Sequence, residues 1–202
     1  MTKVDNYWIL LQCGNDDSAI IGYLPDDVPP KRKLKNNKKI LDQFPEITNL
    51  EFNEDYPDNI KLYDFVDNTM SLLIVSERVK SVFDDQGIDL VEYIPVNIYD
   101  HQQNLAGENY FIINILNIQP IIDMKKSKYK MSRLQKDQIQ FINDLHLNLD
   151  SVDPEAKLFK ASNEKVYHYI TNEVLEALKN SGITGIRAVK AEGWDGNTLS
   201  FL

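Results

Sequence analysis

The pattern of apolar and polar residues is clearest in the middle of the chain, where it predicts a strand, a helix and a second strand. The apolar run over residues 71–75 predicts a buried strand. Ser76 can then accept a bond from a free backbone N–H at a helix start, and Gly87 suits the left-handed position that ends a helix. Between them, apolar residues recur at the spacing of one buried helix face: Val79, Val82 and Phe83.

Further apolar runs predict the rest of a sheet. Residues 90–99 and 110–118 have the length and composition of strands, and we expect them to pair antiparallel around the polar loop between them. A second unit of the same design follows near the C-terminus: a strand at 166–170, a helix from Thr171 to Gly182, and a strand at 186–189. The elements together predict an α+β fold, in which two or three helices pack on a mixed, largely antiparallel sheet.

Other stretches carry weaker patterns. Residues 134–145 have a helical rhythm and predict a third helix. The apolar runs at 7–13 and 18–24 predict an N-terminal hairpin, and residues 25–67 are expected to be largely irregular. We therefore expect a single domain over residues 1–202, with 1–60 as a possible appendage of hairpin and irregular chain.

Length, charge and cysteine content narrow the class of protein. The chain has 202 residues, of which 43% are hydrophobic, so it can bury a sizeable core. Its net charge of -9 argues against nucleic acid or an anionic membrane as the main partner and suits a basic protein partner. One cysteine, Cys13, cannot form an internal disulfide and is expected to be inert in a buried strand. With no signal-peptide pattern at the start, the expected location is the cytoplasm.

A search for catalytic or metal-binding motifs finds little. The three histidines, His101, His146 and His168, lie in separate elements without the spacing of metal ligands. His101 is expected in solvent, and His168 is expected to be a buried structural residue. Asp150 or Asp153, followed by Glu155 and Lys157, resembles the carboxylates and lysine that hold a divalent cation in some nucleases. This pattern leaves a metal-dependent nuclease or hydrolase open as an alternative. No cofactor site is indicated.

Two charged blocks of opposite sign lie in the first third of the chain. The basic run Lys31–Lys39 could bind nucleic acid, or could be a solvated loop whose charge the acidic block offsets. The overall acidity favours the loop. Residues 51–67 form the acidic block.

Several blocks of the sequence resemble a family of bacterial immunity proteins from polymorphic toxin systems, first defined around a myxobacterial protein. The resemblance covers roughly residues 60–190 and is strongest over residues 73–77 and 184–186. The blocks follow one another in the expected order: Ser71–Lys80, Gly87, Val91–Val96, Tyr110–Leu116, Ile122–Asp123, Lys157–Lys160 and Gly182–Arg187. Even with this resemblance, Ser76 and Glu77 are interpreted as helix-capping residues, and Arg78 is expected in solvent, away from the apolar stripe.

The resemblance implies a binding protein rather than an enzyme. Its partner would be a cognate toxin, encoded by an adjacent gene, whose active site the protein occludes. An acidic inhibitor would gain association rate with a basic toxin such as a nuclease. Trp194 is a candidate anchor in that interface, although folding back to close the core is the favoured interpretation. The candidates for electrostatic contacts are Glu51, Glu54, Asp55 and Asp58, for which a merely solvated loop is the favoured alternative.

Overall fold

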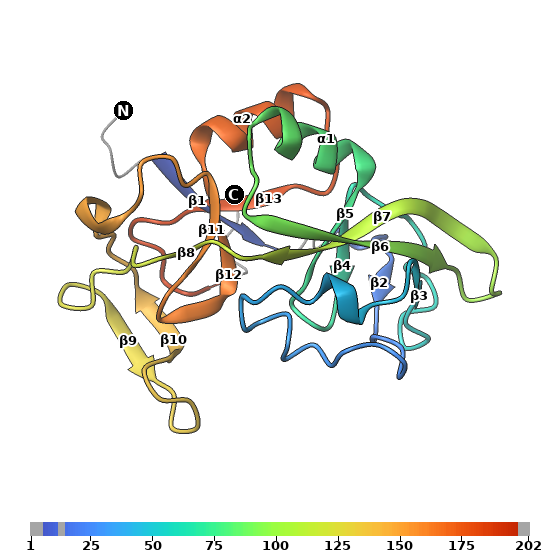
Figure 1. Cartoon of the computed structure of the whole chain (residues 1–202), viewed down its shortest axis with the longest axis horizontal. Helices are drawn as coiled ribbons and strands as arrows, with labels where there is room; N and C mark the ends of the chain where they lie inside the picture. The colour runs from blue at the N-terminus through green and yellow to red at the C-terminus, as the bar shows by residue number, and fades with distance from the viewer. Residues whose placement is uncertain (1–5, 12–14, 198–202) are drawn as a thin grey trace. The chain divides into compact units, whose positions relative to one another are not determined.

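The computed structural model of the chain describes residues 6–11 and 15–197 (Figure 1). Its internal contacts group into two compact units. Among the described residues, the first unit holds 6–11, 117–176 and 188–197, and the second holds 15–116 and 177–187. Helix α2 (Asn172–Asn180) begins in the first unit and ends in the second.

The second unit is built on a six-stranded mixed sheet in the order β2-β4-β5-β7-β6-β3. Antiparallel pairing joins β4 to β5, β5 to β7 and β7 to β6, whereas β2 and β3 add to the two edges in parallel. The strands are β2 (Ile20–Ile21), β3 (Thr48–Glu51), β4 (Phe65–Asn68), β5 (Leu73–Ser76), β6 (Val91–Tyr99) and β7 (Leu105–Ile115).

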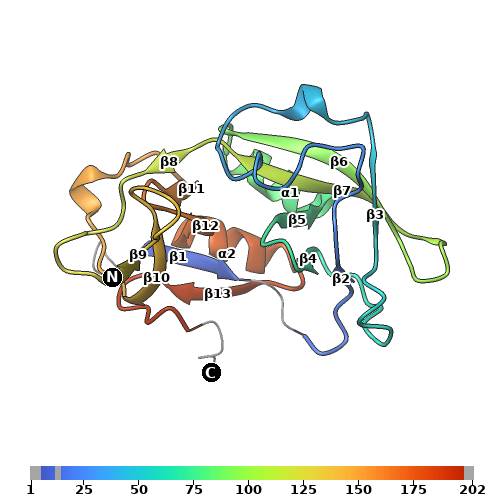
Figure 2. The same ribbon diagram turned by 90° about the horizontal axis from the view of Figure 1, so that it is seen from below.

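The two faces of this sheet are covered differently. Ile74, Ile112 and Ile94 lie in one row across β5, β7 and β6, on the face that also packs against the segment between β2 and β3. That segment contains a short 3₁₀ turn, η2 (Leu41–Gln43), and Figure 2 shows it crossing the β6–β7 ribbon on the side away from α1. Helix α1 (Glu77–Asp85) contacts β5 and β7 and buries its predicted apolar face: Val79, Val82 and Phe83.

The first unit contains a five-stranded sheet in the order β13-β1-β12-β11-β8. Its centre is an aligned row across three strands, Ile9, Tyr169 and Phe159, in which the two rings stack with centroids 5.7 Å apart. All three side chains are fully buried. The strands are β1 (Tyr7–Leu11), β8 (Ile118–Gln119), β11 (Leu158–Ala161), β12 (Glu164–Thr171) and β13 (Arg187–Lys190), and a 3₁₀ turn η3 spans Leu149–Ser151.

A separate two-stranded sheet completes the first unit. It pairs β9 (Lys128–Met131) with β10 (Ile139–Asp144) antiparallel. Figure 1 shows its tip projecting away from the five-stranded sheet of the same unit. The helix predicted over residues 134–145 is therefore wrong. Two bulges in the pairing place Ile139, Ile142 and Leu145 on the buried side, so a strand here copies the three-residue spacing of a helix.

The α+β class and the mixed sheet agree with the prediction, but the strands divide among more than one sheet and two α-helices are present among the described residues. The N-terminal hairpin is wrong, because β1 pairs with β12 and β2 pairs with β4. Residues 25–67 are less irregular than expected, since they supply β3 and the start of β4.

Cys13 lies outside the described residues. No helix in the described part of the chain has the length and apolar character to cross a membrane.

Candidate functional site

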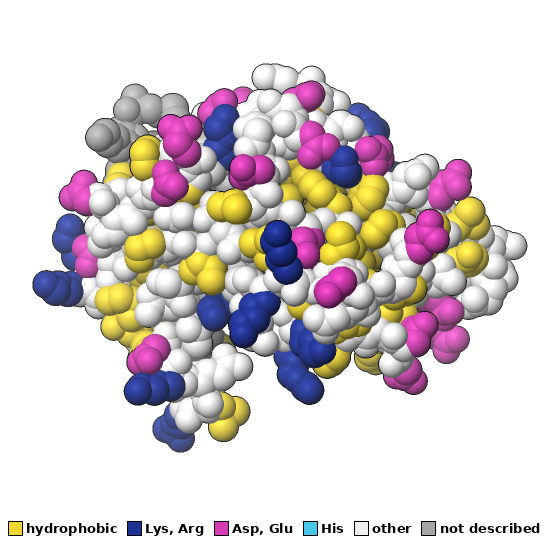
Figure 3. Space-filling model, in the orientation of Figure 1, with side chains coloured by type: hydrophobic (Ala, Val, Ile, Leu, Met, Phe, Trp, Pro, Cys, Tyr) yellow, Lys and Arg dark blue, Asp and Glu magenta, His cyan; other side chains and the backbone are white. Residues whose placement is uncertain are grey.

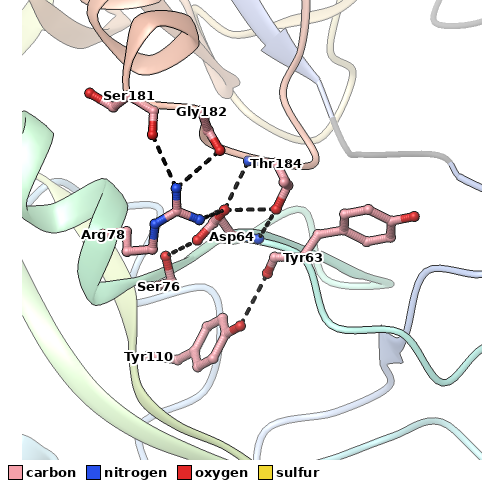
Figure 4. Close-up of polar contacts among 8 residues, drawn as sticks. All are labelled: Tyr63, Asp64, Ser76, Arg78, Tyr110, Ser181, Gly182 and Thr184. Atoms are coloured by element: carbon pink, nitrogen blue, oxygen red, sulfur yellow. Dashed lines mark hydrogen bonds and ion pairs between the residues drawn. The ribbon is translucent and has the colours of Figure 1, made fainter.

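The second unit contains a buried carboxylate, Asp64, that accepts four hydrogen bonds (Figure 4). Asp64 precedes β4 and is only 6% exposed. Ser76 donates its hydroxyl to Oδ1 at 2.7 Å, and Arg78 Nη1 donates to Oδ2 at 2.8 Å. Thr184 donates its backbone N–H at 2.8 Å and its hydroxyl at 2.7 Å, both to Oδ2. One carboxylate thus joins the start of α1 to the loop after α2.

Arg78 has a second role in this cluster. Its Nη2 donates to the carbonyl oxygens of Ser181 and Gly182, each at 3.0 Å. These carbonyls follow the end of α2, where a cation is favourable because the helix dipole is negative there. The expected exposure of Arg78 is confirmed, since 56% of its side chain is exposed, but the sequence did not indicate its bonds to Asp64 and to the end of α2.

Ser76 occupies the N-cap position of α1 in extended backbone, as predicted, but its side chain makes no capping bond. The hydroxyl is directed to Asp64 instead, because a charged acceptor forms a stronger hydrogen bond. Thr171 does accept a long bond from the backbone N–H of Val174, at 3.5 Å. Gly87 and Gly182 have positive φ values of 70° and 61° and end the two helices as predicted.

The electrostatics of the Asp64 cluster are those of a structural ion pair rather than of a catalytic group. Burial alone would raise the pKa of Asp64, but the hydrogen bonds from Ser76 and Thr184 and the charge of Arg78 outweigh it, and the pKa is lowered. A carboxylate with a lowered pKa that already accepts four hydrogen bonds is a poor general base. We assign the cluster to holding the α1 and α2 ends of the second unit together.

An exposed acidic surface lies elsewhere on the second unit. Backbone hydrogen bonds join the chain at residues 17–20 to residues 53 and 61 there. The N–H of Ala19 donates to the carbonyl of Lys61, and the N–H of Lys61 donates to the carbonyl of Asp17. The N–H of Asn53 donates to the carbonyl of Ile20. Asp17 also accepts the hydroxyl of Tyr63 at 2.7 Å, the main reason that its pKa is lowered. The acids brought together here are all exposed: Asp16, Asp17, Glu51, Glu54, Asp55 and Asp58.

Large apolar side chains stand among these acids. Tyr23 is 75% exposed and follows Gly22, whose backbone lies against Asn53. Ile60 is 64% exposed, and Tyr56 is also exposed. We call the six acids with these three residues the acidic face. Figure 3 shows acidic and hydrophobic side chains gathered at the lower right of the view, over the end of β3 and the loop after it.

Trp194 lies in the core of the first unit and is 5% exposed. Its ring meets that of Tyr167 edge to face with centroids 4.6 Å apart, and its Nε1 donates to the carbonyl of Asn197 at 3.2 Å. This is the core position that the sequence left open beside the interface role. A role as partner anchor would require the indole to leave this packing.

The residues of the alternative nuclease site are engaged in local structure. Asp153 Oδ1 accepts the backbone N–H of Glu155 at 3.0 Å and forms a turn, while Lys157 pairs with Glu173 of α2 at 3.0 Å. Within residues 6–11 and 15–197, no three His, Cys, Asp or Glu side chains are grouped closely enough to hold a metal ion.

The histidines and the basic run are also tied into the fold. His101 is partly buried and bonds the carbonyl of Asn53 at 3.2 Å, so the expectation of a solvated side chain is wrong. His146 Nδ1 lies 2.7 Å from Glu192 Oε1, and His168 is buried in β12. In the basic run, Leu34 enters the core and Asn37 donates to the carbonyl of Ile115 at 2.8 Å.

Sequence reasoning missed Asp64, Tyr23 and Ile60. Asp64 stands in an acidic block without a motif around it, and its partners are up to 120 residues away. Tyr23 was assigned to a predicted strand of a hairpin. Its exposure follows from the real pairing of β2, which ends at Ile21.

Comparison with known proteins agrees with the resemblance. No curated protein matches the chain. A family model described as Immunity protein family (Imm11) matches residues 23–193, a longer stretch than the sequence blocks indicated. Because this match spans most of the chain, the protein belongs to the Immunity protein family (Imm11).

Proposed function

We propose that the protein protects the cell that makes it by binding a cognate toxin and covering the toxin's active site. The family membership supports an immunity function in general. The observation that carries the proposed mode of action is the acidic face, where charged groups surround exposed apolar residues. Apolar anchors within a polar rim are the usual anatomy of a protein interface.

The chemistry of the acidic face indicates a basic partner surface. Tyr23 and Ile60 can bury apolar area on contact, and Tyr56 adds an aromatic ring with a polar tip. The surrounding carboxylates match the cationic cleft of an enzyme that acts on a polyanion. The net charge of -9 adds long-range attraction to such a cleft and raises the association rate. We therefore place a nuclease first among the toxin classes.

We propose further that the protein works without catalysis, in the cytoplasm, and that its toxin is encoded by an adjacent gene as part of a polymorphic toxin system. Direct binding at an active site needs no chemical step from the inhibitor. The well-bonded Asp64 cluster and the locally engaged Asp153 and Lys157 are consistent with this mode.

The test is co-expression with the toxin domain of the adjacent gene, followed by pull-down and binding kinetics. Reversing charge at Glu54, Asp55 and Asp58 should slow association about tenfold or more at low salt and flatten its salt dependence. A matched control reverses three exposed acids elsewhere on the second unit: Glu46, Asp85 and Asp89. This control should associate within about twofold of the wild-type rate.

Two results would count against the proposal. Rescue of growth by the wild-type protein without a detectable complex would exclude direct occlusion. Cleavage of DNA or RNA by the purified protein in the presence of Mg²⁺ or Mn²⁺, lost in Glu155→Ala, would favour the nuclease alternative instead.

A further inference from the structure

The β9–β10 hairpin is one of two stretches that concentrate positive charge in this acidic chain, the other being the basic run Lys31–Lys39. Residues 125–136 contain six lysine or arginine residues and no aspartate or glutamate, out of 22 basic residues in a chain of net charge -9. Lys126 pairs with Asp123 and Lys128 with Asp144. The remaining four have no ion pair within the described part of the chain: Lys125, Lys130, Arg133 and Lys136.

The same segment exposes large apolar side chains. Leu134, between the strands, is 96% exposed, and Phe141 on β10 is 55% exposed. Lys130 stands opposite Phe141 in the pairing, with its Nζ 5.9 Å from the ring centroid. Figure 3 shows hydrophobic and basic side chains together at the lower-left tip. We call residues 125–141 the basic arm.

The buried side of the arm is already accounted for. Ile139 and Ile142 enter the core of the first unit, and Tyr129 packs against it. The exposed apolar residues are therefore not needed to hold the hairpin in place. A leucine that is almost fully exposed at a projecting tip gains free energy only when a second surface covers it.

Protection of a strand edge explains only part of this pattern. Lysines on an edge strand discourage pairing with other chains, which accounts for Lys128 and Lys130 on β9. Arg133 and Lys136 lie outside both strands, and Leu134 between them works against such protection.

We propose that the basic arm is a second docking site, which binds an acidic surface of the toxin that has an apolar hollow for Leu134. This inference rests on the proposed function. Charge complementarity supports it, because Arg133 and Lys136, which have no ion pair in the described part of the chain, flank the exposed Leu134 and favour an anionic partner surface with apolar area. A protein is favoured over nucleic acid, since Leu134, the most exposed apolar residue of the arm, is aliphatic and cannot stack on a base, and the whole chain is acidic.

The experiment measures binding of arm variants to an inactive form of the adjacent-gene toxin domain. Leu134→Ser should speed dissociation about tenfold or more, as expected for an anchor. Arg133→Glu with Lys136→Glu should slow association about tenfold at low salt and much less at high salt. The control is Lys31→Glu with Arg32→Glu, an equal change of charge at exposed sites in the second unit, which should stay within about twofold.

The outcomes separate the two proposals. If the wild-type complex forms and the arm variants bind as tightly as the control, the arm inference is overturned while the proposed function stands. If the wild-type protein forms no complex, both are overturned. Binding of a labelled single-stranded RNA or DNA at about 150 mM salt, lost on reversal of Arg133 and Lys136, would make the arm a nucleic-acid site. Self-association in sedimentation that Leu134→Ser abolishes would make a second copy the occupant. Either of these results overturns the inference.

Discussion

Replacing Asp64 by alanine should be among the most damaging single changes in the second unit. The substitution leaves three donors of Ser76 and Thr184 without their acceptor in a buried site, at about 1–3 kcal/mol each when no water replaces it. Arg78 is half exposed and can turn to solvent, so its contribution is discounted. We expect a loss of about 3–5 kcal/mol in the free energy of unfolding, as for other broken buried ion pairs.

Urea unfolding followed by far-UV circular dichroism measures this loss. With a urea dependence of about 2 kcal/mol per molar, the midpoint should fall by about 1.5–2.5 M. Both tryptophans, Trp8 and Trp194, belong to the first unit, so their fluorescence reports that unit separately. A shift in both signals means that the units unfold together, and a shift in dichroism alone means that they do not. Asp58→Ala, at an exposed site of the same unit, should leave the midpoint unchanged.

The pH dependence gives an independent check. The pKa of Asp64 is lowered in the folded protein from its ordinary value of 3.8, so its ionised form stabilises the fold at higher pH. This stabilisation is complete above about pH 4–5 and is lost as pH falls through the folded pKa. The stability difference between wild type and Asp64→Asn should therefore shrink below about pH 4. An unchanged midpoint in Asp64→Ala, or a difference constant down to pH 2, would refute the role assigned to the cluster.

Three further substitutions test the packing. Phe83→Ala removes a fully buried ring under α1 and should cost about 3–5 kcal/mol, measured by urea unfolding; no change would place Phe83 outside the core. Gly196→Ala should lower the melting temperature much more than Gly87→Ala. Both glycines have positive φ, but only at Gly196 would the new Cβ overlap a backbone carbonyl oxygen, that of Ile142. Equal falls in melting temperature would contradict this. Trp194→Ala should lower stability by about 3–5 kcal/mol but leave the dissociation rate of a toxin complex unchanged, whereas faster dissociation would indicate an anchor role.

The elements that the sequence predicted are those whose signals lie within about fifteen residues. A serine or threonine at the start, an apolar face and a glycine at the stop define both helices. Apolar stretches define β5, β6 and the second half of β7, whose residues 105–109 were expected in the loop. Each of these signals acts through local backbone and side-chain geometry. The pairing of β6 with β7 was also predictable, since a short polar loop joins them.

The errors arise where pairing is distant or irregular. β1 looks like half of a hairpin in the sequence, yet its partner β12 begins more than 150 residues later. β3 has only four residues and is defined by parallel pairing with β6, which no local pattern encodes. In β10, bulges convert the alternation of a strand into the spacing of a helix.

The candidate sites divide in the same way. Glu54, Asp55 and Asp58 were identifiable by charge alone, because a run of acids in a short segment is expected to be exposed. Tyr23 and Ile60 could not be added to them, since their exposure depends on how two segments meet. The residues around Trp194 indicate only a turn, and it is tertiary packing that places the ring in the core.

The two segments in which the resemblance to immunity proteins is strongest meet at one point in the structure. Residues 73–77 supply Ser76 and residues 184–186 supply Thr184, and both side chains bond Asp64. The resemblance in these two segments therefore reflects the hydrogen bonds that stabilise the second unit, and carries no information on a partner. Under the proposed function, members of the family that bind different toxins would share these hydrogen bonds and differ in their surfaces. The acidic face and the basic arm both lie outside these two segments, where side chains can change without disturbing the Asp64 cluster. Exchange of either surface with that of another family member should then transfer toxin preference while leaving the unfolding midpoint in place.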